Sequence, residues 1–197
     1  MARPPLNKDK LVATATELFA SKGYQATSVR DIAAAMNMTV SNIYHYFGSK
    51  EGLLRAILKH YSQILLDQLR EVAASEGDPL ERFRLLLSTH LKVVGSRPLE
   101  NKIFLLDDER LSAEGMDANR QVQREVLTIY TNELGKLAQL GLLRDEELHL
   151  QAFNIFGIIN WHMRWYRPQG PLSLAATIDK ICDFVLYGMI KRPGQTG

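Results

Sequence analysis

Apolar residues along this chain recur every three or four positions, and no segment alternates apolar and polar residues with a period of two. A spacing of three or four places apolar side chains on one face of an α-helix, whereas a half-buried strand requires a period of two. The sequence therefore predicts an all-α protein of about nine helices, with no strand and no internal repeat.

Glycine, proline and capping residues divide this pattern into segments. Gly23, Asn37, Gly48 and the stretches "SEGDP" and "RPQGP" interrupt it. The predicted helices span about 10–22, 29–36, 40–46, 50–74, 79–95, 99–111, 115–140, 145–166 and 172–190. Thr27 and Ser28, Thr39 and Ser49 are the expected N-caps of the second, third and fourth helices.

The composition is that of a folded globular protein, with 46% hydrophobic and 23% charged residues. No apolar run is long enough to cross a membrane. The N-terminus is polar and basic, unlike a secretory signal. Cys182 is the only cysteine, which excludes an internal disulfide and fits a reducing compartment. We therefore expect a cytoplasmic protein.

The net charge of +2 is unevenly distributed. Residues 1–60 carry eight Lys and Arg residues against four acidic residues, and the remaining residues carry 16 against 18. A basic front on a mildly acidic body is typical of a nucleic-acid-binding module attached to another domain. A small basic excess of this kind is also common in other proteins, so the charge alone decides little.

A tight polar bend joins the second and third predicted helices. It runs from Ala34 to Thr39 and contains Asn37, a residue that tolerates a left-handed backbone. The small alanines before the bend permit two helices to cross closely. This is the arrangement of a helix-turn-helix, whose second helix enters the DNA major groove.

The third helix, "VSNIYHYF", divides into two faces. Ile43 and Phe47 share one side with Met38, which suits the interior. The opposite side, expected to face outward, holds four residues: Val40, Ser41, Tyr44 and His45. Such a set is unusual for solvent and suited to DNA.

Each outward side chain has a matching contact on DNA. Val40 can touch a thymine methyl group, and Ser41 and Asn42 can hydrogen-bond base edges. Phosphates can accept hydrogen bonds from Tyr44, His45 or Tyr46. Lys50, in the first turn of the next helix, can hold a phosphate together with the free amides there. Thr27 occupies the corresponding start of the second helix.

These segments resemble the TetR family of one-component transcriptional regulators. The resemblance covers about residues 8–54 and rests on "TVSNIYHYFGSKEGLL" and "TATELFASKGYQATSVRDIAAAMNMTVS". The family usually has glycine where Asn37 stands, and asparagine tolerates the same backbone. The resemblance implies DNA contacts at Thr27, Thr39, Ser41, Tyr44, His45, Tyr46 and Lys50. The alternative for each of them is a capping or packing role.

The resemblance also implies a helix-turn-helix DNA-binding domain at residues 1–50 and a helical ligand-binding and dimerisation domain at residues 51–197. The family dimerises through its last two helices. Both carry apolar stripes here, which a four-helix bundle across a two-fold axis would bury. The predicted dimer contacts are Leu148, Ala152, Ile155, Phe156, Ile178, Ile181, Cys182, Val185 and Met189. The alternative is a purely internal core.

"NIFGIINWHMRWYRP" holds both tryptophans of the chain one helical turn apart, with polar groups around them. Such a cluster can line a pocket for a largely apolar ligand with a polar end. The predicted lining is Phe104, Leu105, Met116, Asn119, Tyr130, Asn160, Trp161, Arg164 and Trp165. The segment resembles family members that sense acyl-CoA thioesters, with arginines 120, 124, 164 and 167 for the anionic end. The alternative places the tryptophans in the core or at the dimer surface.

Two other classes of protein, a metalloenzyme and a helical scaffold, fit the sequence less well. Glu146 and His149 form half of a Glu-x-x-His metal motif, but a di-iron bundle requires a second one, which the sequence lacks. No phosphate loop or nucleophile elbow is present. An enzyme, a cofactor and a metal are therefore not expected. A helical dimeric scaffold would leave the outward side chains of the third helix unexplained.

The predicted function is that of a homodimeric repressor. It binds a palindromic operator as double-stranded DNA, and a small inducer, for which an acyl-CoA is one candidate, releases it. The helix beginning at Lys50 is expected to couple the two events.

Overall fold

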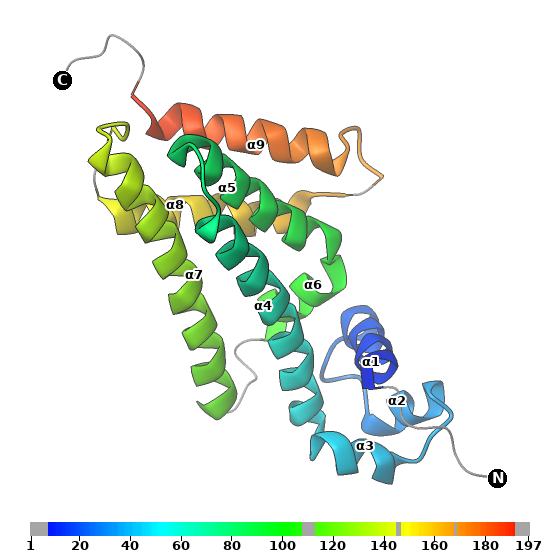
Figure 1. The fold of residues 1–197 in the computed structure, drawn as a ribbon. Coiled ribbons are helices and arrows are strands. Elements are labelled where there is room, and N and C mark those ends of the chain that lie inside the picture. Colours follow the sequence, from blue (N-terminus) through cyan, green and yellow to red (C-terminus); the bar gives the residue numbers. More distant parts are fainter. Residues whose placement is uncertain (1–7, 108–112, 145–146, 168, 192–197) are drawn as a thin grey trace. The chain divides into compact units, whose positions relative to one another are not determined.

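The computed structural model describes residues 8–107, 113–144, 147–167 and 169–191, and every regular element within them is an α-helix (Figure 1). The all-α prediction is confirmed. The helices are α1 (Lys8–Lys22), α2 (Val29–Ala35), α3 (Val40–Phe47), α4 (Lys50–Ala74), α5 (Pro79–Ser96), α6 (Pro98–Asp107), α7 (Ala113–Gln139), α8 (Leu148–Trp165) and α9 (Leu174–Met189).

Helix boundaries follow the local chemistry of the chain. Gly23 and Gly48 have φ angles of 90° and 70° and end α1 and α3 in a backbone region open to glycine. The Asp78 carboxylate accepts hydrogen bonds from two amides at the start of α5, both at 2.9 Å. The last helix begins two residues later than predicted, because the Ser173 hydroxyl accepts from the Ala176 amide and fixes the N-terminus there.

The chain divides into two compact units, Met1–Gln63 with Pro98–Arg120 and Ile64–Arg97 with Gln121–Gly197. The division falls inside α4 and inside α7, so each of these helices contributes turns to both units. The functional domains expected at residues 1–50 and 51–197 have other bounds than these two compact units. That division into functional domains stays a prediction.

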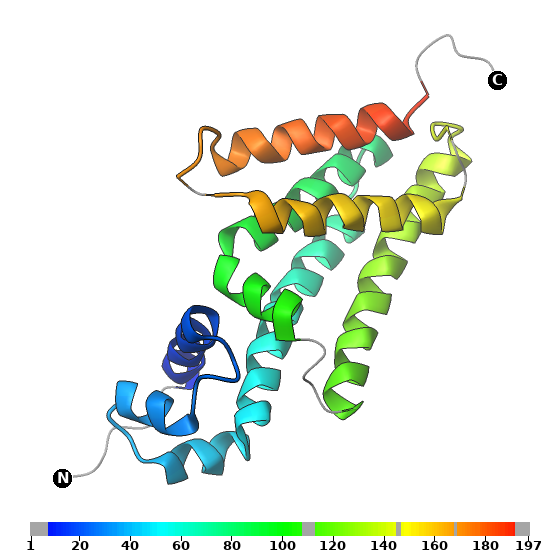
Figure 2. The same ribbon diagram turned by 180° about the vertical axis from the view of Figure 1, so that it is seen from behind.

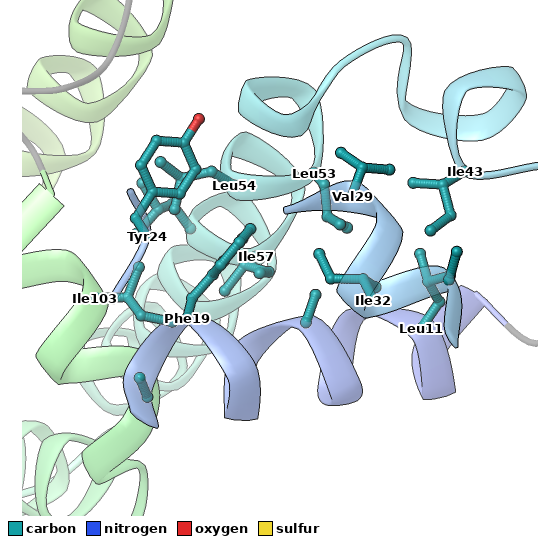
Figure 3. Packing of buried hydrophobic residues seen from close by; sticks show 14 residues of the cluster. Leu11, Phe19, Tyr24, Val29, Ile32, Ile43, Leu53, Leu54, Ile57 and Ile103 are labelled. Atoms are coloured by element: carbon teal, nitrogen blue, oxygen red, sulfur yellow. The ribbon is translucent and has the colours of Figure 1, made fainter. Parts of the chain in front are cut away.

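The first unit has a continuous apolar core (Figure 3). Leu11 and Phe19 of α1 meet Ile32 of α2, Ile43 of α3 and the first turns of α4. The buried residues of this core are Leu11, Ala15, Phe19, Ala20, Tyr24, Val29, Ile32, Ala33, Ile43, Leu53, Leu54, Ile57, Leu58 and Ile103. This core fixes the position of α3 within the unit.

The second unit is built on α5, α8 and α9, together with parts of α4 and α7. Helices α8 and α9 lie alongside each other in both views (Figures 1 and 2). An isolated antiparallel bridge joins Leu143 to Ile190, with flanking hydrogen bonds from the Arg144 amide to the Met189 carbonyl and from the Lys191 amide to the Leu142 carbonyl, each 2.9 Å. The bridge ties the connection before α8 to the end of α9.

Candidate functional site

Hydrogen bonds between near neighbours fix both the start of α2 and the turn that joins it to α3. The Ser28 hydroxyl accepts from the Asp31 amide (3.1 Å), and the Asp31 carboxylate accepts from the Ser28 amide (2.7 Å), which completes a capping box at α2. The Ser28 hydroxyl also donates to the Asp31 carboxylate (2.7 Å), and this bond, followed by the one from the Ser28 amide, lowers the pKa of Asp31. Asn37 has a φ of 50°, as its predicted left-handed role requires, and the Met38 amide donates to the Ala33 carbonyl (2.9 Å). The bend therefore has one defined geometry.

Helix α3 is anchored by one face. Ile43 is completely buried, and Met38 and Phe47 are half-buried against the same core. Val40 is also half-buried and packs against this core, so the expectation that it faces outward is corrected in part. Its position in the first turn of α3 places it at the edge of the buried face.

The other face of α3 is open to solvent. Ser41, Tyr44, His45 and Tyr46 are exposed, and Tyr44 and Tyr46 expose 48% and 43% of their surface. The rings of His45 and Tyr46 meet edge to face with centroids 5.2 Å apart. Thr39 precedes the helix without a side-chain capping bond and is exposed, and Asn42 is half-buried. Aromatic and hydrogen-bonding groups thus share one exposed surface.

Two lysines of the same unit lie over tyrosine rings. The Lys50 ammonium is 4.2 Å from the centroid of the Tyr24 ring and 3.4 Å from the Gln25 carbonyl oxygen. The Lys8 ammonium is 5.5 Å from the centroid of the Tyr46 ring. The contact between the Tyr24 ring and the Lys50 ammonium was not predicted from the sequence. A residue between two helices gives no periodic signal of which residues it faces.

Thr27 is buried, whereas its predicted role as a DNA contact requires an exposed side chain. Its side chain is buried, and its hydroxyl donates to the carbonyls of Gly23 (2.9 Å) and Leu18 (3.2 Å). These bonds close the end of α1. Because the hydroxyl is already used inside the protein, Thr27 has no side-chain donor for DNA in this arrangement.

The predicted dimer contacts are mostly interior residues of the second unit. Ala152, Ile155, Ile178, Cys182, Val185 and Met189 are buried, and Leu148, Phe156 and Ile181 are half-buried. Burial raises the pKa of the Cys182 thiol to about 11. Most of this set therefore lies on the inner side of α8 and α9, as the alternative of an internal core describes, whereas the half-buried Ile181 also lines a groove on the other side. The apolar stripes point inward because α5 supplies a facing surface.

A second apolar face lies on the outer side of α8 and α9. Trp161 exposes 65% of its surface, Phe184 71% and Tyr187 69%. Part of this face is a groove of about 440 Å³ lined by Phe153, Asn154, Gly157, Ile158, Trp161, His162, Trp165, Ile181 and Phe184. We name these residues, with Tyr187, the outer α8–α9 face. Both helices are thus apolar on two sides, which a single sequence stripe does not reveal.

His162 is one of the residues that line this groove. Its side chain is almost fully buried, its ring stacks on Tyr166, and it meets Trp165 edge to face at 5.2 Å. Neither ring nitrogen has a hydrogen-bond partner among the described residues. Burial lowers the pKa of His162, which favours the neutral ring.

The predicted ligand-binding residues belong to both units and differ in their burial. Asn160, Trp161, Arg164 and Trp165 are exposed on α8, whereas Asn119 and Tyr130 are buried. The side chains of Phe104, Leu105 and Met116 lie outside the described residues. The Tyr130 hydroxyl is instead 3.0 Å from Nδ1 of His90. This ring pair packs with Phe83 and Phe156 in the second unit.

The described ranges contain no group of three or more residues that could hold a metal ion. His149 of the half motif is exposed, and Glu146 lies outside the described residues. Across the helices that the structure describes, none combines the length and the apolar character that a membrane span requires.

A short helix that follows a tight turn and exposes hydrogen-bonding side chains defines a helix-turn-helix DNA-binding protein. Comparison with models of protein families indicates the same class of protein. Residues 11–57 match the model described as bacterial regulatory proteins of the tetR family, and residues 76–189 match the tetracyclin repressor-like C-terminal domain. The chain belongs to the TetR family of transcriptional regulators. It is therefore a regulator rather than an enzyme, and the N-terminal resemblance is confirmed.

Individual relatives match over nearly the whole chain. The HTH-type transcriptional repressor KstR2 of Mycobacterium tuberculosis is 27% identical over 93% of both chains. The TetR-family regulator PfmR of Thermus thermophilus has a TM-score of 0.85 at 26% identity, covering 91% of this chain and 98% of its own. AibR, solved with isovaleryl coenzyme A and operator DNA, has a TM-score of 0.82 at 25% identity, covering 90% and 96%.

Proposed function

We propose that the protein is a homodimeric repressor that binds a palindromic operator and leaves it when a largely apolar ligand binds. The observation that carries this proposal is the two-sided character of α3. Its inner face is fixed by the fully buried Ile43, while its outer face presents Tyr44, His45 and Ser41 to solvent. A helix held in this way can insert into the major groove without reorganising the unit.

The proposed DNA contacts are Thr39, Val40, Ser41, Asn42, Tyr44, His45, Tyr46 and Lys50. Hydroxyl and amide groups at the start of α3 suit base edges, and the tyrosines and Lys50 suit phosphates. Val40 contributes the exposed half of its side chain to a thymine methyl group. Thr27 is left out because its hydroxyl donates inside the protein.

A second copy is the proposed occupant of the outer α8–α9 face. An exposed apolar surface that runs over two neighbouring helices suits an isologous interface, in which the same patch meets itself across a two-fold axis. Two recognition helices would then enter successive major grooves about 34–36 Å apart, which requires a palindromic site. Repression follows when such a site overlaps a promoter. A protein that acts on promoter DNA in this way is expected in the cytoplasm.

For the ligand we propose an acyl-CoA thioester. The support comes from AibR, whose solved complex contains isovaleryl coenzyme A and operator DNA. A ligand can shift the balance only by binding the released state more tightly than the DNA-bound state. Helix α4 is the proposed coupling element, because it contributes turns to both units and begins at Lys50.

The test is operator binding followed by ligand titration. Genomic fragments, including the promoter beside its own gene, are screened by gel shift at several salt concentrations. We expect salt-sensitive binding of at least one fragment, and its release by an acyl-CoA. Coenzyme A alone and the free fatty acid are the control ligands, and they separate recognition of the thioester from recognition of either end. Absence of binding to every fragment would favour a dimeric scaffold.

A further inference from the structure

Lys50 is held in place before any DNA arrives. Its ammonium lies over the face of the Tyr24 ring, 4.2 Å from the centroid, and donates to the Gln25 carbonyl at 3.4 Å. A lysine side chain is flexible and strongly hydrated, so an exposed one samples many positions. An aromatic face and a carbonyl oxygen together restrict where this ammonium can lie.

The Tyr24 ring is itself fixed. Only 8% of Tyr24 is exposed, and its ring meets the Phe19 ring edge to face with centroids 5.1 Å apart and planes at 70° (Figure 3). Leu54 belongs to the same core. The backbone holds it as well, because the Tyr24 carbonyl accepts a hydrogen bond from the Thr27 amide at 3.3 Å. The ring therefore provides a rigid surface for the ammonium.

The start of α4 is fixed independently. The Ser49 hydroxyl accepts from the Gly52 amide at 2.9 Å, so the first turn that carries Lys50 has one capped conformation. With the backbone held by this cap and the ammonium held by Tyr24, both ends of the Lys50 side chain are restrained.

We infer that Tyr24 is a positioning residue for operator binding, which holds the Lys50 ammonium where it meets a DNA phosphate. The inference rests on the proposed function. Restraining the side chain in the free protein lowers the entropy lost when a phosphate binds, so Tyr24 increases affinity without touching DNA. A tyrosine that only fills the core would not affect Lys50.

The test measures coupling between the two residues. The probe is a duplex cut from the promoter fragment that the unchanged protein binds, and Kd is measured against salt. Lys50→Ala is expected to reduce the slope of log K against log salt by about 1, the value for one lost phosphate contact. Tyr24→Leu is expected to weaken binding about two- to fivefold, as for a partly exposed cation–π contact.

Three comparisons isolate the ring face. Tyr24→Phe keeps the ring and is expected to keep the affinity. Phe83→Leu makes the same change from ring to aliphatic side chain at a fully buried position in the second unit, away from the Tyr24 contact, and is expected to leave binding unchanged. In a chain that already carries Lys50→Ala, Tyr24→Leu is expected to have no further effect. If Tyr24 had a purely structural role, Tyr24→Leu would instead weaken DNA binding by the same factor with Lys50 present and with Lys50→Ala.

The outcomes separate the two proposals. If Lys50→Ala weakens binding and Tyr24→Leu has the same effect in both backgrounds, Tyr24 is a core residue and the inference fails alone. If the unchanged protein binds no fragment, the proposed function and the inference fail together. Should Tyr24→Leu not fold, a phenylalanine fluorinated at its rim is placed at position 24. It keeps the shape and weakens the negative ring face, and unchanged affinity would then contradict the inference.

Discussion

His90 shows at the residue scale how burial controls the charge of a side chain. It lies inside the second unit against the rings of Tyr130 and Phe156, with Nδ1 3.0 Å from the Tyr130 hydroxyl. Loss of solvation lowers its pKa from 6.5 to about 4. The folded protein therefore holds a neutral imidazole at neutral pH.

This shift predicts acid sensitivity. Below about pH 6.5 the unfolded chain takes up a proton at His90, whereas the folded chain does not until about pH 4. The contribution of His90 to the free energy of unfolding is thus fully present above pH 6.5 and is lost as the pH falls to 4. By linkage the loss amounts to about 3 kcal/mol. Urea unfolding at a series of pH values measures it.

The matched control is the double variant His90→Phe with Tyr130→Phe, which removes the titrating ring and the hydroxyl that would lose its partner. Its free energy of unfolding should change less between pH 6.5 and 4, although His162, whose pKa is also lowered, still contributes. An equal acid loss in both proteins would mean that His90 is not the source.

Some single residues could be assigned from the sequence and others could not. Ser28 and Asn37 were predictable, because capping and left-handed backbone depend on a residue and its near neighbours. Thr27 was misassigned, since its hydroxyl donates to Leu18, nine positions away on α1. Lys50 was expected near phosphate, but its ring partner Tyr24 depends on how the loop after α1 folds back.

At the scale of the element, the two faces of α3 have different roles. One face packs in the core of the first unit, and the other is the proposed DNA-contacting face. Its buried side was predicted from the spacing of Ile43 and Phe47, because the 3.6-residue period alone determines which residues share a side. Val40, at the first turn, was assigned correctly only in part, because half of its side chain packs against the core. A residue at the edge of a helical face is covered or exposed according to the neighbouring helix, which periodicity does not describe.

Tyr44 provides the test of this separation. Tyr44→Ala should lower operator affinity at least about thirtyfold, the factor for an interface side chain worth 2 kcal/mol or more. Anisotropy of a labelled operator duplex measures it. Tyr44→Phe removes only the hydroxyl and should cost about five- to tenfold. Thermal stability should stay nearly unchanged in both variants, because the ring is 48% exposed. Unfolding of Tyr44→Ala would show that the ring belongs to the core.

Helices α5 and α7 are joined by a buried ion pair. The Glu133 carboxylate is almost fully buried and accepts a hydrogen bond from Nε of Arg82 at 2.8 Å and one from Lys136. Arg82 also donates to the carbonyls of Ser75 and Gly77 in the α4–α5 connection. The guanidinium therefore links three segments of the second unit.

Removal of this guanidinium should be costly. Arg82→Met leaves the Glu133 carboxylate buried with a single cationic neighbour and should lower the free energy of unfolding by about 3 kcal/mol or more. The matched control lies two residues away. Arg84→Met removes the partly exposed pair with Asp183 and should cost less than about 1 kcal/mol. Chemical denaturation of both variants measures the difference, and equal losses would mean that burial of the pair is not what matters.

At the scale of the whole molecule, the outer α8–α9 face determines the proposed assembly. Phe184→Glu places a charge on this face and should convert the proposed homodimer to a monomer, because the carboxylate would lose its hydration in the interface. Analytical ultracentrifugation gives the mass, and operator binding should be lost with the dimer. Leu99→Glu changes an apolar residue that is 40% exposed on α6 and should leave the dimer intact. A Phe184→Glu protein that remains dimeric would exclude this face as the interface.

The sequence by itself determined the all-α class, the helix-turn-helix and the outward tyrosine of α3. These features depend on periodicity, turns and caps, which act over a few residues. Only the tertiary structure decided which side of α8 and α9 is interior, and where the Lys50 ammonium lies. Both helices are apolar on two sides, and the side that becomes core is the one for which α5 supplies a facing surface. That pairing is set by contacts between segments far apart in the chain.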